Sequence, residues 1–194
     1  MNGLRPVHSE TLGRTDCRAR GVVVVTGFPG SGKSLVAGLL GSELGIPVIS
    51  KDQIKIRLWE FSPQFRDLDS RSLGRFAIEE MFSSPRQFDP VILDSFFWPG
   101  LSESDLLLLE RPLVQVHCNT PIEVCIKRFR EREVQDRHTA LRDPSGPEVS
   151  IGRWSGIAEG PLQIPGPLYE LDTSSNLDIV AASDFVRDAL SQTT

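Results

Sequence analysis

The chain has 194 residues, of which 39% are hydrophobic and 24% charged, and this composition suits one domain with a sizeable core. Its formal net charge of −5 argues against a general nucleic-acid binder, because such proteins usually present a basic surface. No apolar stretch reaches the roughly 20 residues of a membrane span, and residues 1–20 lack a signal-peptide pattern. The odd number of cysteines, without metal-ligand spacing, indicates a reducing compartment. We therefore expect a cytoplasmic protein with a flexible leader over residues 1–20 and a single domain over 21–194.

Strand and helix patterns alternate along the chain from residue 22 onward. Continuous apolar runs predict buried strands, whereas helical spacing, Gly and Pro boundaries and two capping boxes (50–53 and 120–123) predict helices. The predicted strands cover 22–26, 48–49, 91–94, 113–118 and 168–172, and the predicted helices cover 33–44, 51–60, 70–82, 101–110, 122–132 and 177–190. Residues 133–167 are rich in Gly, Pro and charge, so we expect a loop or lid there. This alternation is typical of an α/β sheet layered by helices.

The segment between the first strand and the first helix carries the most specific motif of the chain. Residues 27–34 read GFPGSGKS and fit G-x-x-x-x-G-K-[ST] in the required strand–loop–helix context. Such a loop turns backbone N–H groups toward a polyphosphate, and the helix N-terminus adds its positive dipole. We predict that ATP binds here with Mg²⁺, with Lys33 at the β- and γ-phosphates and the Ser34 hydroxyl on the ion. The remaining loop contacts are expected from Gly27, Gly30, Ser31 and Gly32. The alternative is a glycine-rich turn with a chance lysine.

A carboxylate ends the third predicted strand. In open parallel sheets, ligands bind outside the carboxyl ends of the strands, and Asp94 occupies such an end. We predict that Asp94 binds Mg²⁺ directly or through water, at the boundary with the acceptor substrate. The alternative is that this residue caps the following turn.

A second acidic candidate lies in the first turn of the helix after the second strand. Asp52 is placed to act as a general base that takes a proton from a substrate hydroxyl. The competing interpretation is that an acid at a helix N-terminus only complements the dipole. Lys55, three residues later, is a candidate for binding the acceptor or the transferred group, with a surface ion pair to Asp52 as its alternative.

Basic residues gather where the helix after the fourth strand meets the predicted lid. Arg132 and Arg137 are our candidates for neutralising charge on the transferring phosphate, and Arg128 for stacking on the adenine or touching the α-phosphate. The alternative is that these cations complement the C-terminal end of the helix dipole.

Most aromatic residues lie between Trp59 and Trp98. Three of them, Phe96, Phe97 and Trp98, directly follow Asp94, so we expect them to line an acceptor pocket. The alternative is ordinary core packing.

Taken in order, these pieces resemble the small P-loop kinases of the zeta-toxin and chloramphenicol-phosphotransferase type, within the adenylate-kinase-like assembly. The matching segments are 27–34, 50–52, 91–94, 123–138 and 171–173. The resemblance implies a three-layer P-loop NTPase fold with a five-stranded parallel sheet in the order 2-3-1-4-5 and an Arg-rich lid. It also implies that Asp52 activates the acceptor hydroxyl and that Thr173 borders the adenine. Asp52 followed by Lys55 resembles phage polynucleotide kinase as well, although that group has Arg at the second position.

The leading hypothesis is an ATP- and Mg²⁺-dependent kinase acting on a hydroxyl of a small molecule such as a nucleoside, sugar or antibiotic. A polynucleotide 5′-hydroxyl kinase is the second hypothesis, and it requires binding that weakens steeply with salt. The third is a nucleotide-dependent switch or interaction module, which needs no acceptor base. The sequence does not predict the oligomeric state.

Overall fold

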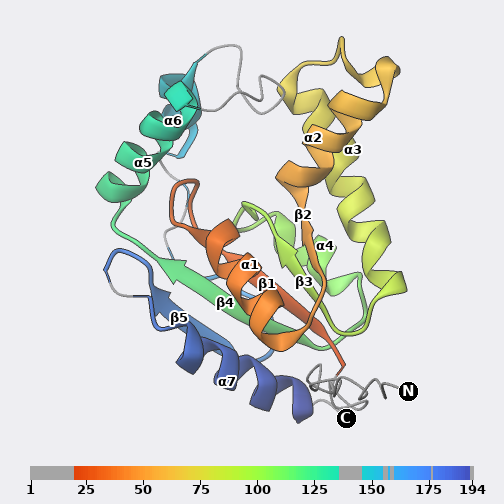
Figure 1. Cartoon of the computed structure of the whole chain (residues 1–194), viewed down its shortest axis with the longest axis vertical. Helices are drawn as coiled ribbons and strands as arrows, with labels where there is room; N and C mark the ends of the chain where they lie inside the picture. The colour runs from red at the N-terminus through yellow and green to blue at the C-terminus, as the bar shows by residue number, and fades with distance from the viewer. Residues whose placement is uncertain (1–19, 136–145, 155–156, 158–159, 176, 193–194) are drawn as a thin grey trace, which may run out of the picture.

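The structure is a computed structural model that describes residues 20–135, 146–154, 157, 160–175 and 177–192. At its centre lies a five-stranded parallel sheet in the order β2-β3-β1-β4-β5 (Figure 1). The strands are β1 (Val22–Thr26), β2 (Val48–Ser50), β3 (Val91–Asp94), β4 (Leu113–Asn119) and β5 (Leu168–Asp172). The strand order confirms the predicted P-loop NTPase fold, and the predicted strand bounds differ from these by one residue at most.

Helices cover both faces of the sheet. They are α1 (Lys33–Leu44), α2 (Lys51–Phe61), α3 (Ser70–Ser83), α4 (Ser102–Leu107), α5 (Ile122–Gln135), α6 (Pro147–Trp154) and α7 (Ile179–Ser191), with 3-10 turns η1 (Pro63–Phe65) and η2 (Ser84–Gln87). Side chains of α1 and α7 pack with Val23 and Val25 on one face, and side chains of α3 and α4 pack with Val22 and Val24 on the other. The apolar run of β1 is continuous because this central strand is buried on both faces.

Two helix pairs rise above the carboxyl edge of the sheet. In Figure 1 the α2 and α3 pair stands on one side and the α5 and α6 pair on the other, with the loop between β1 and α1 between them. The contacts of α2 are mainly with α3, while α6 contacts α5. Both pairs therefore border the edge where the sequence places the phosphate loop.

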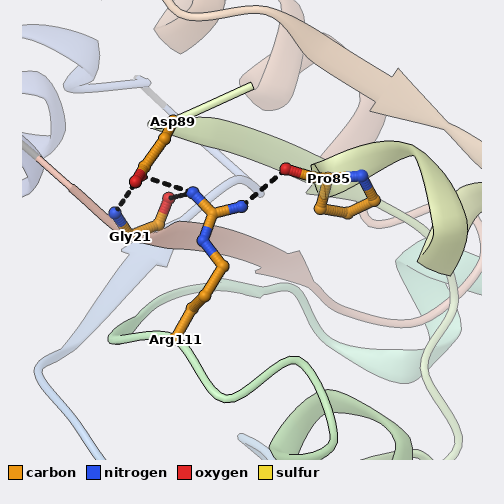
Figure 2. Close-up of polar contacts among 4 residues, drawn as sticks. All are labelled: Gly21, Pro85, Asp89 and Arg111. Atoms are coloured by element: carbon orange, nitrogen blue, oxygen red, sulfur yellow. Dashed lines mark hydrogen bonds and ion pairs between the residues drawn. The ribbon is translucent and has the colours of Figure 1, made fainter. Parts of the chain in front are cut away.

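A polar clamp closes the opposite edge of the sheet (Figure 2). The Arg111 guanidinium donates to the carbonyl oxygens of Pro85, at 2.8 Å, and Gly21, at 3.2 Å, and forms an ion pair with Asp89. The Gly21 N–H donates to Asp89 Oδ1 at 2.8 Å. The clamp thus joins the start of β1 to the connection before β3 and to the turn before β4.

Three details differ from the sequence predictions. Residues 147–154, expected in a loop or lid, form helix α6. The capping box at Ser50 is wrong, because its hydroxyl makes no cap bond and instead donates to Asp94 Oδ2 at 2.9 Å. Helix α4 is shorter than predicted. No helix in the described part of the chain has the length and apolar character needed to cross a membrane. Apart from Arg20, the predicted leader lies outside the described residues.

Candidate nucleotide and acceptor site

The loop between β1 and α1 is fixed by its own glycines and by the start of α5. Gly30 and Gly32 have φ values of 88° and 87°, a left-handed conformation that favours glycine. A Cβ on Gly30 would lie 2.2 Å from the carbonyl oxygen of Cys125, so the loop backbone packs directly against α5. The Thr120 hydroxyl also donates to the Ser31 carbonyl at 3.3 Å. The loop therefore has its shape before any ligand binds.

The loop ends in the N-terminus of α1, whose first residues are Lys33 and Ser34. Its N-cap is Gly32, which has no side chain to bond the first N–H groups, and the first turn holds no acidic residue. These N–H groups and the helix dipole can therefore stabilise an anion. The Lys33 side chain is buried, with 7% exposed.

Asp94 lies at the carboxyl end of β3, between Val25 of β1 and Ser50 of β2. Its side chain is 3% exposed, and Oδ1 has no hydrogen-bond partner among the described residues. Burial raises the pKa of Asp94, while the nearby Lys33 charge opposes that rise. Hydrogen bonds from Ser34 and Ser50 also oppose it. A buried, partly unsatisfied carboxylate of this kind is stabilised by a cation.

The oxygens of Asp94 and Ser34 fit a magnesium ion. Mg²⁺ prefers oxygen ligands and is usually held by one or two protein groups together with phosphate oxygens and water. The unpartnered Oδ1 of Asp94 provides such a ligand, and the Ser34 hydroxyl lies close enough to act on the pKa of the same carboxylate. These are the two residues that the sequence predicts as ion ligands.

A cavity of about 1100 Å³ brings most of the predicted reaction residues together. Ser34, Asp52, Asp94 and Arg132 all line it. Helix α2 supplies much of the remaining wall, both apolar and charged, through Ile54, Ile56, Arg57, Leu58 and Phe61. Small-molecule sites commonly combine an apolar wall with a few polar groups in this way.

Asp52 is half-buried in the first turn of α2 and faces this cavity. Its charge adds to the rise in the pKa of Asp94, which results mainly from burial. It also opposes the burial that lowers the pKa of Lys51. Asp52 therefore lies near both residues, in a position that either a base or a dipole-complementing acid would occupy.

Lys55 does not line the described cavity. Its side chain is 6% exposed, and Nζ donates to the Ser70 hydroxyl of α3 at 2.8 Å. The structure thus places this predicted acceptor residue in the seam between α2 and α3. Nothing in the sequence pattern pointed to Ser70 as its partner.

The predicted adenine residues lie together on the other side of the loop. Arg128 Nη1 donates to the Thr173 carbonyl oxygen at 3.1 Å, and the Thr173 hydroxyl bonds that of Thr120. Arg132 is exposed, and its guanidinium carbon lies 5.3 Å from the Phe129 ring centroid. The other predicted lid arginine, Arg137, lies outside the described residues.

The three aromatic residues predicted to line an acceptor pocket lie in different surroundings. Phe97 is buried in the core with β1 and β3, so its predicted place in an acceptor pocket is wrong. Phe96 stacks on Phe28 of the phosphate loop, at 5.8 Å between ring centroids, and contacts Trp98 at 5.0 Å. Trp98 is 37% exposed. None of the three lines the 1100 Å³ cavity formed by the described residues.

Trp154 of α6 is a residue that the sequence reasoning missed. Its ring centroid lies 6.1 Å from that of Phe28 and 5.0 Å from that of Phe129 on α5. Arg130 and Glu148 join the same helices through bonds of 2.7 and 2.8 Å. Helix α6 is therefore held against both α5 and the phosphate loop. The one signal in the sequence that could have pointed to this helix was an isolated tryptophan within a Gly- and Pro-rich segment.

More than half of the chain matches one protein family. A family model described as AAA domain (AAA_33) matches residues 22–143, which include the phosphate loop, Asp52 and Asp94. A comparison with curated proteins finds no match.

Solved structures share the fold over almost the whole chain. A candidate kinase from Chloroflexus aurantiacus J-10-fl is 25% identical with a TM-score of 0.75, over 88% of this chain and 98% of that one. The APS kinase of Mycobacterium tuberculosis, in complex with AMPPNP and APS, is 18% identical with a TM-score of 0.55, over 88% and 98% of the two chains. Kti12 of Chaetomium thermophilum, in complex with ADP-AlF3, is 19% identical with a TM-score of 0.59, over 87% and 98%. The last two similarities concern the fold alone.

Proposed function

The chain belongs to the AAA domain family AAA_33, and from that premise we propose that it is an ATP-dependent kinase for a small-molecule hydroxyl. The observation that carries the proposal is one cavity lined by Ser34, Asp52 and Asp94, beside the buried Lys33. A phosphate-binding lysine, two oxygen ligands for an ion and a separate carboxylate are the parts that phosphoryl transfer requires.

In this proposal the chain first binds and orients the triphosphate. The N–H groups of the loop and of the α1 N-terminus surround the β- and γ-phosphates, and Lys33 neutralises part of their charge. Magnesium, when bound, would be held by Ser34 and Asp94 and would neutralise further phosphate charge. Arg128 and Thr173, which are bonded to each other, border the adenine. Arg132, on α5, and Arg137 complete the charge neutralisation.

Asp52 then acts on the acceptor. Its carboxylate accepts the proton of the acceptor hydroxyl as that oxygen bonds to the γ-phosphorus, and the bond from the γ-phosphorus to the bridging oxygen breaks. ADP leaves with the bridging oxygen, and the acceptor becomes a phosphate monoester. A positioned general base contributes roughly 10²–10⁴-fold to such a step.

The test is a panel of hydroxylated metabolites and antibiotics, scored by ADP release above a blank without acceptor. The phosphorylated product is identified by mass spectrometry, and the Lys33→Ala variant is the control. We expect acceptor-dependent ADP release that this variant lacks. Release without any phosphorylated product would instead favour a nucleotide-dependent switch. Product formed only on oligonucleotide 5′ ends, with strong salt dependence, would favour the polynucleotide kinase.

A further inference from the structure

Two buried threonines connect the phosphate loop to the ends of β4 and β5. Thr120 comes directly after β4 and Thr173 directly after β5, and each has 9% of its surface exposed. Their hydroxyl groups bond each other, and we call them the hydroxyl pair. Thr120 Oγ1 also lies 3.3 Å from the carbonyl oxygen of Ser31, while Thr173 Oγ1 lies 3.5 Å from that of Asn119.

The number of hydrogens in the hydroxyl pair decides which of these contacts are bonds. Each hydroxyl donates one hydrogen, so only two of the three contacts can be hydrogen bonds at the same time. The Asn119 carbonyl already accepts the Thr173 N–H at 3.1 Å, and its contact with the hydroxyl is the longest of the three. Ser31 has no exposed surface, so an unpaired carbonyl there would be costly. We therefore expect Thr173 to donate to Thr120, and Thr120 to donate to Ser31.

The bond to the Ser31 carbonyl also orients the N–H group of the same peptide unit. In a trans peptide the C=O and N–H point in opposite directions, so a C=O held toward Thr120 turns the Gly32 N–H away from it. Gly32 is the N-cap of α1, where N–H groups can bind an anion. Glycine itself resists rotation of the peptide only weakly. The Thr120 hydroxyl therefore supplies a restraint that the loop residue lacks.

We propose that Thr120 is a positioning residue for phosphate binding, because its hydroxyl holds the Ser31 carbonyl so that the Gly32 N–H faces the phosphates. Thr173 contributes by donating its own hydrogen, which leaves the Thr120 hydrogen for Ser31. The inference rests on the nucleotide-binding part of the proposed function and does not depend on the identity of the acceptor.

The first test measures phosphate binding without an acceptor. AMPPNP and inorganic tripolyphosphate, each with Mg²⁺, are titrated by calorimetry into the full-length wild type, Thr120→Val and Thr120→Ser. We expect Thr120→Val to weaken both ligands by about 3- to 30-fold, because a misdirected N–H loses part of a hydrogen bond to a charged group. Thr120→Ser keeps the hydroxyl and should bind both like wild type. Since tripolyphosphate has no base, a changed adenine contact cannot explain its weaker binding.

Thr26→Val is the matched control. Thr26 is a buried threonine at the end of β1, and its hydroxyl bonds His117 Nδ1 at 3.0 Å. This variant should lose stability but keep its affinity for tripolyphosphate. Equal weakening in both valine variants, or unchanged affinity in Thr120→Val, would overturn the inference and leave the kinase proposal standing. Wild-type protein that binds neither ligand would overturn both, whereas Thr120-dependent binding without any phosphorylated acceptor would count against the kinase proposal alone.

The direction of the hydroxyl pair has a test of its own. If Thr173 donates to Thr120, then Thr173→Val leaves the Thr120 hydrogen on Ser31 and should bind tripolyphosphate with close to wild-type affinity. The double variant should then bind it like Thr120→Val alone. Tighter binding by Thr173→Val would show that the Thr120 hydrogen points to Thr173 in the wild type, and would overturn the proposed role.

Heteronuclear NMR reports on the Gly32 N–H directly. Its amide resonance is assigned by its loss in Gly32→Ala, and tripolyphosphate with Mg²⁺ is then added to wild type and to Thr120→Val. We expect a marked shift of this resonance in wild type and a much smaller one in the valine variant at equal occupancy. The same shift in both proteins would contradict the positioning of this N–H by Thr120.

Discussion

The seating of the phosphate loop against α5 leads to a prediction about two glycines. Gly30 and Gly32 have nearly the same left-handed φ, 88° and 87°, so alanine meets the same backbone strain at both, roughly 1–2 kcal/mol. Their surroundings differ. The added Cβ would lie 2.2 Å from the Cys125 oxygen at Gly30, but its nearest neighbour at Gly32 is Thr173 Cβ at 3.9 Å. Comparing the two alanine variants therefore distinguishes the cost of packing the loop against α5 from the cost of its left-handed backbone conformation.

The magnitude follows from the distance at Gly30. The separation of 2.2 Å is too short for a carbon and an oxygen, so the loop or α5 has to move by about 1 Å. Overpacking of this kind typically costs about 1–3 kcal/mol. We expect Gly30→Ala to lose about 2–5 kcal/mol of unfolding free energy and Gly32→Ala about 1–2 kcal/mol.

The assay is thermal and urea unfolding of the nucleotide-free proteins, side by side. The expected difference of about 1–3 kcal/mol corresponds to a gap of about 2–12 °C in Tm for a domain of this size. Gly45→Ala is a further control, because its φ of 66° is also left-handed and its added Cβ meets nothing within 4 Å. Equal stability of Gly30→Ala and Gly32→Ala would refute the packing of the loop against the Cys125 carbonyl.

Three other predictions concern the surroundings of the site. Burial raises the pKa of Asp94, so ionising this carboxyl lowers the stability of the folded protein as pH rises above the unfolded pKa near 3.8. Asp94→Asn should therefore stabilise the nucleotide-free protein at neutral pH and abolish the effect of Mg²⁺ on nucleotide binding. Urea unfolding measured as a function of pH checks this, and a variant less stable than wild type would contradict it. Arg111→Ala should lower the unfolding free energy by about 1.5–3 kcal/mol, and calorimetry should find the nucleotide affinity unchanged. A change in nucleotide affinity without a loss of stability would show that the clamp is not purely structural. Trp154→Ala should destabilise the protein and weaken AMPPNP binding, because the Trp154 ring packs on Phe28 of the phosphate loop. A variant that binds AMPPNP as tightly as wild type would show that α6 does not support the loop.

The fold was predictable from the sequence where local signals and tertiary environment agree. The buried strands are short apolar runs, so their bounds were visible in the residues alone. Helix α6 was missed because it has only eight residues, and Trp154 is its one buried residue among those described. A single buried aromatic gives no helical periodicity to detect.

The sequence predicted which candidate residues lie together, but it did not predict the contacts that they make. The sequence placed Ser34, Asp52 and Asp94 at strand and helix ends that parallel strands bring together, and all three line one cavity. It misread Ser50, because a capping pattern cannot reveal that the hydroxyl bonds Asp94 from 44 residues away.

Phe97 illustrates a second limit. Consecutive residues after a strand point in different directions, and composition does not say which one turns inward. Phe96 joins the aromatic group on the phosphate loop, whereas Phe97 completes the core beneath β1 and β3. A run of three aromatics could therefore be placed near the site but not divided between site and core.

The central claim is that the loop residues bind the nucleotide while Asp52 activates the acceptor. The most direct measurement pairs the kcat for acceptor phosphorylation with the calorimetric Kd for AMPPNP and Mg²⁺, in wild type and Asp52→Asn. We expect kcat to fall by roughly 10²–10⁴-fold and Kd to stay unchanged. Equal losses in kcat and in nucleotide affinity, or full activity of the variant, would contradict it.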